Sequence, residues 1–178
     1  MESRSSSDLS ISFFGALGIE PRFDIDLGEL ERAFHARSAE VHPDRFASAP
    51  AAERVAALSK SMELNQAYKT LKRPVPRAEY LLARAGKGIA EGEKVDASFL
   101  AEVLELREEL EEARAAAKLD EVTRLERVMK ARHDGLVAGL APAFAKGDLA
   151  DARKIVIELR YVARYLEACD AALDEDAA

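Results

Sequence analysis

The sequence predicts an all-α protein, with a helical hairpin in its N-terminal part and a three-helix bundle in its C-terminal part. Apolar residues recur at spacings of three and four through both parts, which is the pattern of helices with one apolar face. The second half shows no alternation of apolar and polar residues of the kind that strands have. The 178 residues, of which 48% are hydrophobic, suffice for one large or two small domains with a core.

The chain begins with a polar stretch. Residues 1–9 contain no long apolar run, so they predict a short disordered tail and not a signal peptide. Residues 10–19 then predict a short helix or turn, whose regularity is limited by Gly15 and Gly18.

Two helices and a polar loop form the predicted hairpin. The first helix covers residues 27–41, and its apolar positions are Leu27, Leu30, Phe34 and Val41. Asp26 supplies its N-cap oxygen. Pro43 has no backbone N–H and disfavours helical dihedral angles at the residue before it, so this helix should end near residue 41. After a loop, a second helix covers residues 50–72, with apolar positions at Leu64, Ala67, Tyr68 and Leu71.

A proline-rich segment separates the two parts. Pro74 and Pro76 favour an extended, fairly stiff connection, so we place the domain boundary at residues 74–77. A short helix over residues 78–85 follows, and the glycines of residues 86–92 form a flexible loop.

The bundle is predicted from three long helical stretches, which cover residues 96–117, 120–140 and 149–173. Asp96 or Ser98 caps the first of them. Gly139 and Pro142 should end or kink the second. The predicted core is the apolar stripe of each helix: Phe99, Val103, Leu106, Leu110 and Ala113; Val122, Leu125, Val128, Met129 and Leu136; Ile155, Val156, Leu159, Val162 and Leu166.

A second face of the first bundle helix is part apolar and part acidic. Leu100 and Leu104 point away from the core stripe, in line with Glu108 and Glu112 at spacings of four. Ala101 and Glu105 lie beside them, and Tyr161 and Tyr165 lie nearly opposite the core stripe of the third helix. Exposed apolar groups surrounded by carboxylates predict a protein-binding surface.

Charge and composition argue against several classes of function. A formal net charge of −7 argues against a nucleic-acid partner, and no stretch approaches the twenty apolar residues of a membrane span. The single cysteine, Cys169, lies on a core stripe and fits a reducing cytoplasm. No cysteine and histidine cluster has the spacing of metal ligands, and no nucleophile or phosphate-binding loop accompanies His42 and Asp44. We therefore expect neither a metal, nor a cofactor, nor enzymatic activity.

The loop motif resembles that of a J-domain. The tripeptide His42-Pro43-Asp44 lies between the hairpin helices, and the second helix ends with the sequence NQAYKTL. The resemblance implies a J-domain over residues 10–73 that binds a DnaK-class chaperone and accelerates its ATP hydrolysis. The residues that it assigns to chaperone binding are His42, Pro43, Asp44, Arg37 and Arg45.

A further resemblance covers nearly the whole chain. The run FLAEVLELREEL over residues 99–110, preceded by RAEYLL over residues 77–82, is similar to HscB, the J-domain co-chaperones of iron–sulfur cluster assembly. It implies that the bundle, residues 78–178, binds the cluster scaffold IscU and that the J-domain delivers this scaffold to the chaperone HscA. The positions that match scaffold-binding residues of the family are Leu100, Leu104, Glu105, Glu108, Glu112 and Tyr161.

Two features depart from the family pattern. Ala101 occupies a position where some relatives carry a larger apolar residue. The helix before the loop is usually basic in J-domains, and here it retains Arg32, His35 and Arg37 but also carries two glutamates. We therefore expect a weaker or more salt-sensitive contact with the chaperone.

Other interpretations remain open from the sequence. The loop tripeptide could merely cap helix ends, and the bundle could form a dimer or bind a different client of a general DnaK chaperone. Leu100 and Leu104 could be covered by the helix over residues 78–85. The glutamates could be an ordinary solvated face, and Tyr161 could simply pack at the bundle edge.

Overall fold

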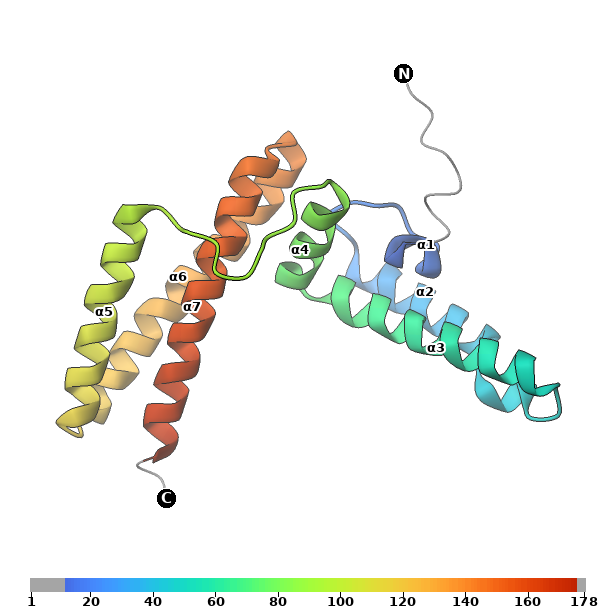
Figure 1. Ribbon diagram of the computed structural model, residues 1–178, viewed down its shortest axis with the longest axis horizontal. Helices are drawn as coiled ribbons and strands as arrows, with labels where there is room; N and C mark the ends of the chain where they lie inside the picture. Colours follow the sequence, from blue (N-terminus) through green and yellow to red (C-terminus); the bar gives the residue numbers. More distant parts are fainter. Residues whose placement is uncertain (1–11, 176–178) are drawn as a thin grey trace. The chain divides into compact units, whose positions relative to one another are not determined.

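The computed structural model describes residues 12–175, and the regular elements in that range are all helical, as predicted. The predicted tail of residues 1–9 lies outside the described residues. The chain divides between Arg77 and Ala78 into two compact units, and each is described by itself. Figure 1 shows the helices of both units.

The first unit is built on a helical hairpin. Its elements are α1 (Phe13–Leu17), α2 (Leu27–Glu40), the 3-10 helix η1 (Pro43–Phe46) and α3 (Ala51–Lys72). α2 and α3 lie side by side, and η1 belongs to the loop at the tip of the hairpin (Figure 1). The predicted N-cap of α2 is confirmed, because the Asp26 carboxylate accepts hydrogen bonds from the backbone N–H groups of Gly28, at 2.7 Å, and Glu29, at 3.2 Å.

Apolar residues of all three α-helices form the core of the first unit. The predicted positions Leu30, Leu64, Ala67 and Leu71 are buried, together with Phe14 and Leu17 of α1. Phe34 of α2 stacks on Tyr68 of α3, with ring centroids 4.2 Å apart and an interplanar angle of 16°. This packing fixes α2 against α3 and so positions the loop between them.

The predicted extended linker is wrong, because residues 74–77 form the first turn of α4 (Pro74–Arg84). Backbone N–H groups in the first turn of a helix have no acceptor within the helix, so two prolines there cost no hydrogen bond. Arg77 is buried and donates from Nη1 to the carbonyl oxygen of Leu71 at 2.7 Å. Its guanidinium also lies 4.8 Å from the centre of the Phe23 ring. These contacts join the start of α4 to the end of α3.

The second unit holds the predicted three-helix bundle. Its long helices are α5 (Ala97–Ala115), α6 (Leu119–Lys146) and α7 (Leu149–Glu175). Asp96 caps α5 by accepting the backbone N–H of Ser98 at 3.0 Å. α6 and α7 lie side by side over much of their lengths (Figure 1). Arg160 of α7 donates from Nε to Glu79 at 2.8 Å, so the last turns of α4 are tied to this bundle.

α6 continues six residues past its predicted end. Pro142 lies inside the helix, although an interior proline removes one hydrogen bond and costs about 3 kcal/mol. Burial of Leu140 and Ala143 on either side of it offsets that cost. Gly139 permits a close approach to α7, since a Cβ there would lie 3.3 Å from Cδ1 of Ile155. Tertiary packing therefore overrides the local signal of the proline.

Two assignments in the predicted core are wrong. Val128 is 44% exposed, because it lies about 100° around α6 from the buried Met129. Tyr165 is buried, and its hydroxyl donates to the carbonyl oxygen of Leu106 at 2.8 Å. Since α7 packs against both α5 and α6, its buried face is wider than a single stripe. Burial raises the pKa of the Tyr165 phenol far above its ordinary value.

The turn between α5 and α6 contains a strained alanine. Ala117 has a φ of +50°, in the left-handed region, which costs a residue with a Cβ about 1–2 kcal/mol. We expect Ala117→Gly to raise the free energy of unfolding by about 0.5–1 kcal/mol, because the relief of strain exceeds the added entropy of glycine in the unfolded chain. Urea denaturation checks this. Ala116→Gly, at a φ of −91°, is the matched control and should lower the free energy of unfolding. An equal loss of stability in both variants would contradict strain at Ala117.

Cys169 is a core residue, as predicted. It is fully buried in the bundle, and burial raises its pKa to about 11, because a thiolate is disfavoured away from water. We expect iodoacetamide at pH 8 to leave the folded protein unmodified over hours and to label it within minutes in urea. Mass spectrometry measures the labelled fraction. Labelling of the folded protein as fast as of a free cysteine would contradict this burial.

Candidate functional site

The tripeptide predicted to bind a chaperone lies at the tip of the α2–α3 hairpin. His42 is the N-cap of η1, and its Nδ1 accepts a hydrogen bond from the backbone N–H of Asp44 at 3.3 Å. The neutral ring in this arrangement carries its proton on Nε2. Because the side chain is 56% exposed, Nε2 can donate to a partner while Nδ1 holds the loop.

Asp44 and Pro43 complete this turn. The Asp44 side chain is 90% exposed, and its Oδ2 lies 3.5 Å from Nδ1 of His42. An ionised carboxylate only accepts hydrogen bonds, so Asp44 offers an acceptor to a partner, whereas Nε2 of His42 offers a donor. Pro43 begins η1, where its missing N–H costs no hydrogen bond. One short helical turn thus presents a donor and an acceptor to solvent.

Two arginines of the predicted site have partners near the end of α2. The guanidinium of Arg45 donates to the carbonyl oxygen of Ala39 at 3.1 Å, and so satisfies one of the last carbonyls of the helix. Arg37 donates to the carboxylate of Glu40 at 3.2 Å, and its side chain is 48% exposed. Both remain accessible, but an incoming protein has to compete with these local contacts.

The basic face of α2 is partly neutralised by its own glutamates. Nε2 of His35 lies 4.0 Å from Glu31, in addition to the pair between Arg37 and Glu40. Exposed pairs of this kind add little to stability. They do lower the positive potential that an acidic partner surface would meet. The expected weak or salt-sensitive contact stays a prediction.

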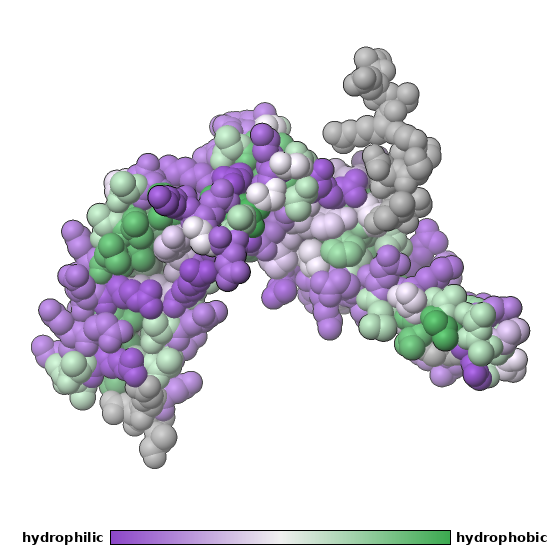
Figure 2. Space-filling view, in the orientation of Figure 1, coloured by the Kyte–Doolittle hydropathy of each residue, from purple (hydrophilic) through white to green (hydrophobic). Residues whose placement is uncertain are grey.

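The second predicted site lies on α5. Leu100 and Leu104 are 37% and 51% exposed, so the interpretation that a preceding helix covers them is wrong. Figure 2 shows a hydrophobic patch over the N-terminal half of α5, within a surface that is largely hydrophilic. The predicted glutamates of this face, at positions 105, 108 and 112, are also exposed.

The glutamates of α5 that face α6 are paired. Glu102 forms an ion pair with Arg132, and Glu109 forms one with Arg124 at 3.1 Å. The hydrogen bond from Arg132 holds the pKa of Glu102 below its ordinary value. These two pairs hold α5 against α6, and so their carboxylates are already engaged.

The glutamates beside Leu100 and Leu104 differ from these two in their surroundings. Within residues 12–175, no ion pair is found for Glu105, Glu108 or Glu112. Glu108 and Glu112 are instead like charges four residues apart, which destabilises a helix slightly. A helix face supported by i,i+4 ion pairs therefore does not describe these residues. Their carboxylates are available to a partner that carries basic groups.

Tyr161 has a packing role at the edge of the bundle. Its ring meets the ring of Phe99 edge-on, with centroids 6.1 Å apart and an interplanar angle of 86°. The side chain is half-buried against the core, and the Arg164 guanidinium lies 6.0 Å from its ring centre. Because Phe99 precedes Leu100, Tyr161 supports the start of the α5 face whether or not it contacts a partner.

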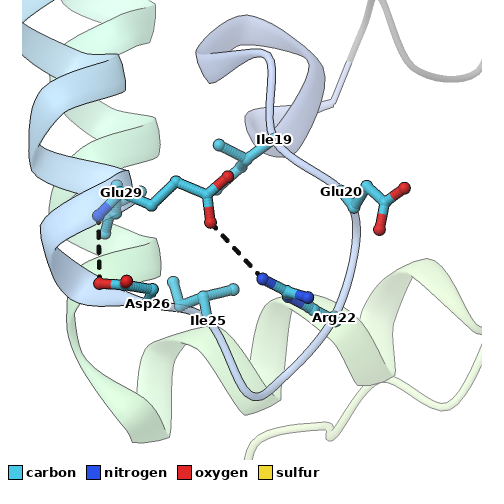
Figure 3. Close-up of a pocket in the computed structure, with 7 residues that line it drawn as sticks. Ile19, Glu20, Arg22, Ile25, Asp26 and Glu29 are labelled. Atoms are coloured by element: carbon cyan, nitrogen blue, oxygen red, sulfur yellow. Dashed lines mark hydrogen bonds and ion pairs between the residues drawn. The ribbon is translucent and has the colours of Figure 1, made fainter.

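A small hollow near the start of α2 carries no chemistry of its own. Figure 3 shows its lining between α1 and α2, with the polar groups of Arg22, Asp26 and Glu29. Asp26 caps α2, and the hydrogen bonds that its carboxylate accepts from Glu29 and Gly28 lower its pKa. Arg22 lies 3.5 Å from the Glu29 carboxylate. These polar groups serve the fold.

The described residues form neither a metal site nor a membrane span. No group of three or more histidine, cysteine, aspartate or glutamate side chains in residues 12–175 is arranged to hold a metal ion. No helix in the same range has the length and apolar character needed to cross a membrane.

One exposed apolar stripe was not predicted from the sequence. Val55, Leu58 and Met62 of α3 are 68%, 53% and 67% exposed. They follow one another at spacings of three and four and lie on the side of α3 opposite the buried Leu64. The signal in the sequence that could have revealed it is a second series of apolar residues on a helix that already has a core stripe.

Two family models match the chain. The DnaJ domain matches residues 12–80, and the HSCB C-terminal oligomerisation domain matches residues 95–170. Two relatives are named as co-chaperone protein HscB homologues. The one from Neisseria meningitidis is 38% identical over 152 residues, 84% of this chain and 92% of its own. The one from Azoarcus is 36% identical over 170 residues, which is 94% of this chain and 96% of its own.

Solved structures agree with these matches. The chaperone HscB from Vibrio cholerae has a TM-score of 0.77 at 31% identity, covering 93% of this chain and 99% of its own. The human co-chaperone HscB has a TM-score of 0.81 at 26% identity, covering 96% and 85%.

The matched DnaJ domain and the His-Pro-Asp turn, with His42 and Asp44 exposed, define the class of a J-domain protein. The second matched domain and the identity over most of the chain give the family. The chain belongs to the HscB family, the J-domain co-chaperones of iron–sulfur cluster assembly.

Proposed function

We propose that this protein binds the iron–sulfur scaffold IscU through α5, delivers it to the chaperone HscA and stimulates ATP hydrolysis by HscA through the His-Pro-Asp loop. The observation that carries the proposal is the presence of two exposed, chemically different surfaces on one chain. The first is the polar turn at His42 and Asp44. The second is the apolar and acidic face at Leu100, Leu104 and Glu108.

The loop acts by docking. Nε2 of His42 donates to an acceptor of the chaperone, and the Asp44 carboxylate accepts from one of its basic groups. The hydrogen bond from the Asp44 N–H to His42 keeps both groups in register before the contact forms. Less conformational entropy is then lost on binding. The ATPase activity belongs to the chaperone, so this role needs no active site on the co-chaperone.

The α5 face supplies affinity and orientation for the scaffold. Burial of Leu100 and Leu104 provides the apolar contribution, at about 25 cal/mol for each Å² removed from water. Glu105, Glu108 and Glu112 pair with basic groups of the scaffold at the rim of that contact. The absence of internal ion pairs for these glutamates among the described residues supports this role, because no existing contact has to be broken.

Both contacts reside on one chain, and this makes delivery efficient. Binding of the scaffold to the bundle turns its encounter with the chaperone into an intramolecular event with a raised effective concentration. Two contacts of modest affinity can then give a productive ternary complex. We place this activity in the cytoplasm, because a single, buried cysteine suits a reducing compartment.

Single-turnover ATP hydrolysis by HscA tests the proposal. This protein alone should accelerate hydrolysis, and addition of IscU should accelerate it further. Acceleration without any added effect of IscU would keep the chaperone role and point to another client of a general DnaK chaperone. No acceleration of either chaperone would remove the proposed function.

A further inference from the structure

Three apolar side chains of α3 lie outside the core of the first unit. Val55, Leu58 and Met62, which we call the α3 stripe, are each more than half exposed. The opposite side of the helix carries the buried Ala57 and Leu64. Figure 2 shows a hydrophobic patch over the half of α3 that lies next to the loop. A contiguous exposed patch of this kind commonly marks an interaction site.

The α3 stripe is confined to the part of the helix near the loop. Continuing along the same side by four and seven residues from Met62 gives Gln66 and Lys69, which are polar and exposed. The first turns of α3 contact η1, which carries Asp44. The exposed apolar surface and the polar turn are therefore neighbours at one end of the hairpin.

The size of the α3 stripe indicates what kind of contact it can make. A stable interface between two proteins takes about 20–30 residues from each side. Three side chains fall far short of a self-sufficient surface for a second copy of the chain or for a separate client. They suffice as an apolar extension of a contact that another part of the same hairpin already makes, and the adjacent contact is the loop.

The charges of α2 support the same conclusion. Arg37 and His35 are near Glu40 and Glu31, so the electrostatic part of loop docking is weakened and sensitive to salt. Apolar burial is not screened by salt in this way. An apolar contact beside the loop would supply affinity that the basic face does not.

We propose that the α3 stripe is a second docking contact for the ATPase chaperone that engages the His-Pro-Asp loop, and that it receives an exposed apolar element of that chaperone. The inference rests on the proposed function of the loop. It assigns different roles to two parts of one interface. His42 and Asp44 set the register that triggers hydrolysis, and Val55, Leu58 and Met62 hold the chaperone in place.

The test is a titration of single-turnover ATP hydrolysis by HscA with the full-length protein and its variants. The triple variant Val55→Gln, Leu58→Gln, Met62→Gln places a polar residue of good helix propensity at three exposed positions, so it should fold normally. We expect the concentration for half-maximal stimulation to rise at least tenfold, while the maximal rate at saturation is unchanged. The rise in the half-maximal concentration, relative to the wild type, should be the same at low and high salt.

The matched control is Ala56→Gln with Glu63→Gln, at exposed positions on a neighbouring side of α3. It should shift the half-maximal concentration less than twofold.

An unchanged titration for the triple variant, with His42→Gln still inactive, would overturn the stripe contact and leave the proposed function standing. If wild type and His42→Gln stimulate HscA equally, both proposals fail. A triple variant that titrates normally but loses self-association in sedimentation would assign the stripe to a second copy and overturn its contact with the chaperone.

Discussion

Replacing His42 by glutamine is expected to remove most of the stimulation of HscA. The imidazole does two things at once, because Nδ1 accepts the Asp44 N–H and Nε2 is left to donate outward. Glutamine carries its donor and acceptor on one flexible amide and cannot hold the turn and donate from opposite sides of a rigid ring. Loss of this docking hydrogen bond leaves the acceptor of the chaperone unsatisfied in the interface, which costs about 2 kcal/mol, or roughly 30-fold in affinity. Single-turnover hydrolysis measures the loss.

The variant has internal controls. His42 is exposed, so the thermal midpoint should change little, and scaffold binding by the bundle should be unaffected. His35→Gln, also on an exposed histidine of the same unit, should retain stimulation within about threefold, since the long, exposed contact of His35 with Glu31 contributes little. Equal losses for His35→Gln and His42→Gln would contradict a special role of the loop.

The second large effect is expected on α5. The double variant Leu104→Ala, Glu108→Ala should weaken IscU binding at least tenfold, because burial of one leucine contributes about 1.5–3 kcal/mol. Leu104 is 51% exposed, so the free energy of unfolding should fall by less than about 0.5 kcal/mol. Removal of Glu108 also relieves its repulsion with Glu112, which is worth about 0.2–0.5 kcal/mol. Calorimetric titration with IscU and urea denaturation separate the two effects.

Two further variants complete this comparison. Glu109→Ala removes a glutamate that is paired with Arg124 and should leave IscU affinity nearly unchanged. Leu110→Ala removes a buried leucine and should destabilise the bundle by about 2–5 kcal/mol. Normal IscU affinity in the double variant, or a loss of stability like that of Leu110→Ala, would show that the α5 face is not the scaffold site.

Most of the fold follows from local signals in the sequence. The helices near the loop begin and end where Asp26 and Pro43 predict, because capping and the missing N–H act within a few residues. The exposure of Leu100 and Leu104 follows from their phase on the helix wheel. The residues proposed to bind partners were placed by resemblance, and their roles stay predictions.

The errors arise where tertiary packing decides. Local rules predict that Pro74 and Pro142 interrupt helices, yet one lies in a first turn and the other between buried residues of α6. A single apolar stripe predicts Tyr165 outside the core, but α7 packs on two helices and buries it. The α3 stripe was missed, because spacing alone does not say which of two apolar sides is buried.

A mixing experiment decides whether one molecule has to hold both the chaperone and the scaffold. Single-turnover hydrolysis by HscA with IscU is compared for the wild type and for an equimolar mixture of two variants, His42→Gln and Leu104→Ala, Glu108→Ala. Each variant keeps one of the two surfaces. We expect the mixture to show the stimulation of a free J-domain without the scaffold-dependent increase, because no single molecule holds both partners. A mixture as active with IscU as the wild type would contradict delivery by a single chain.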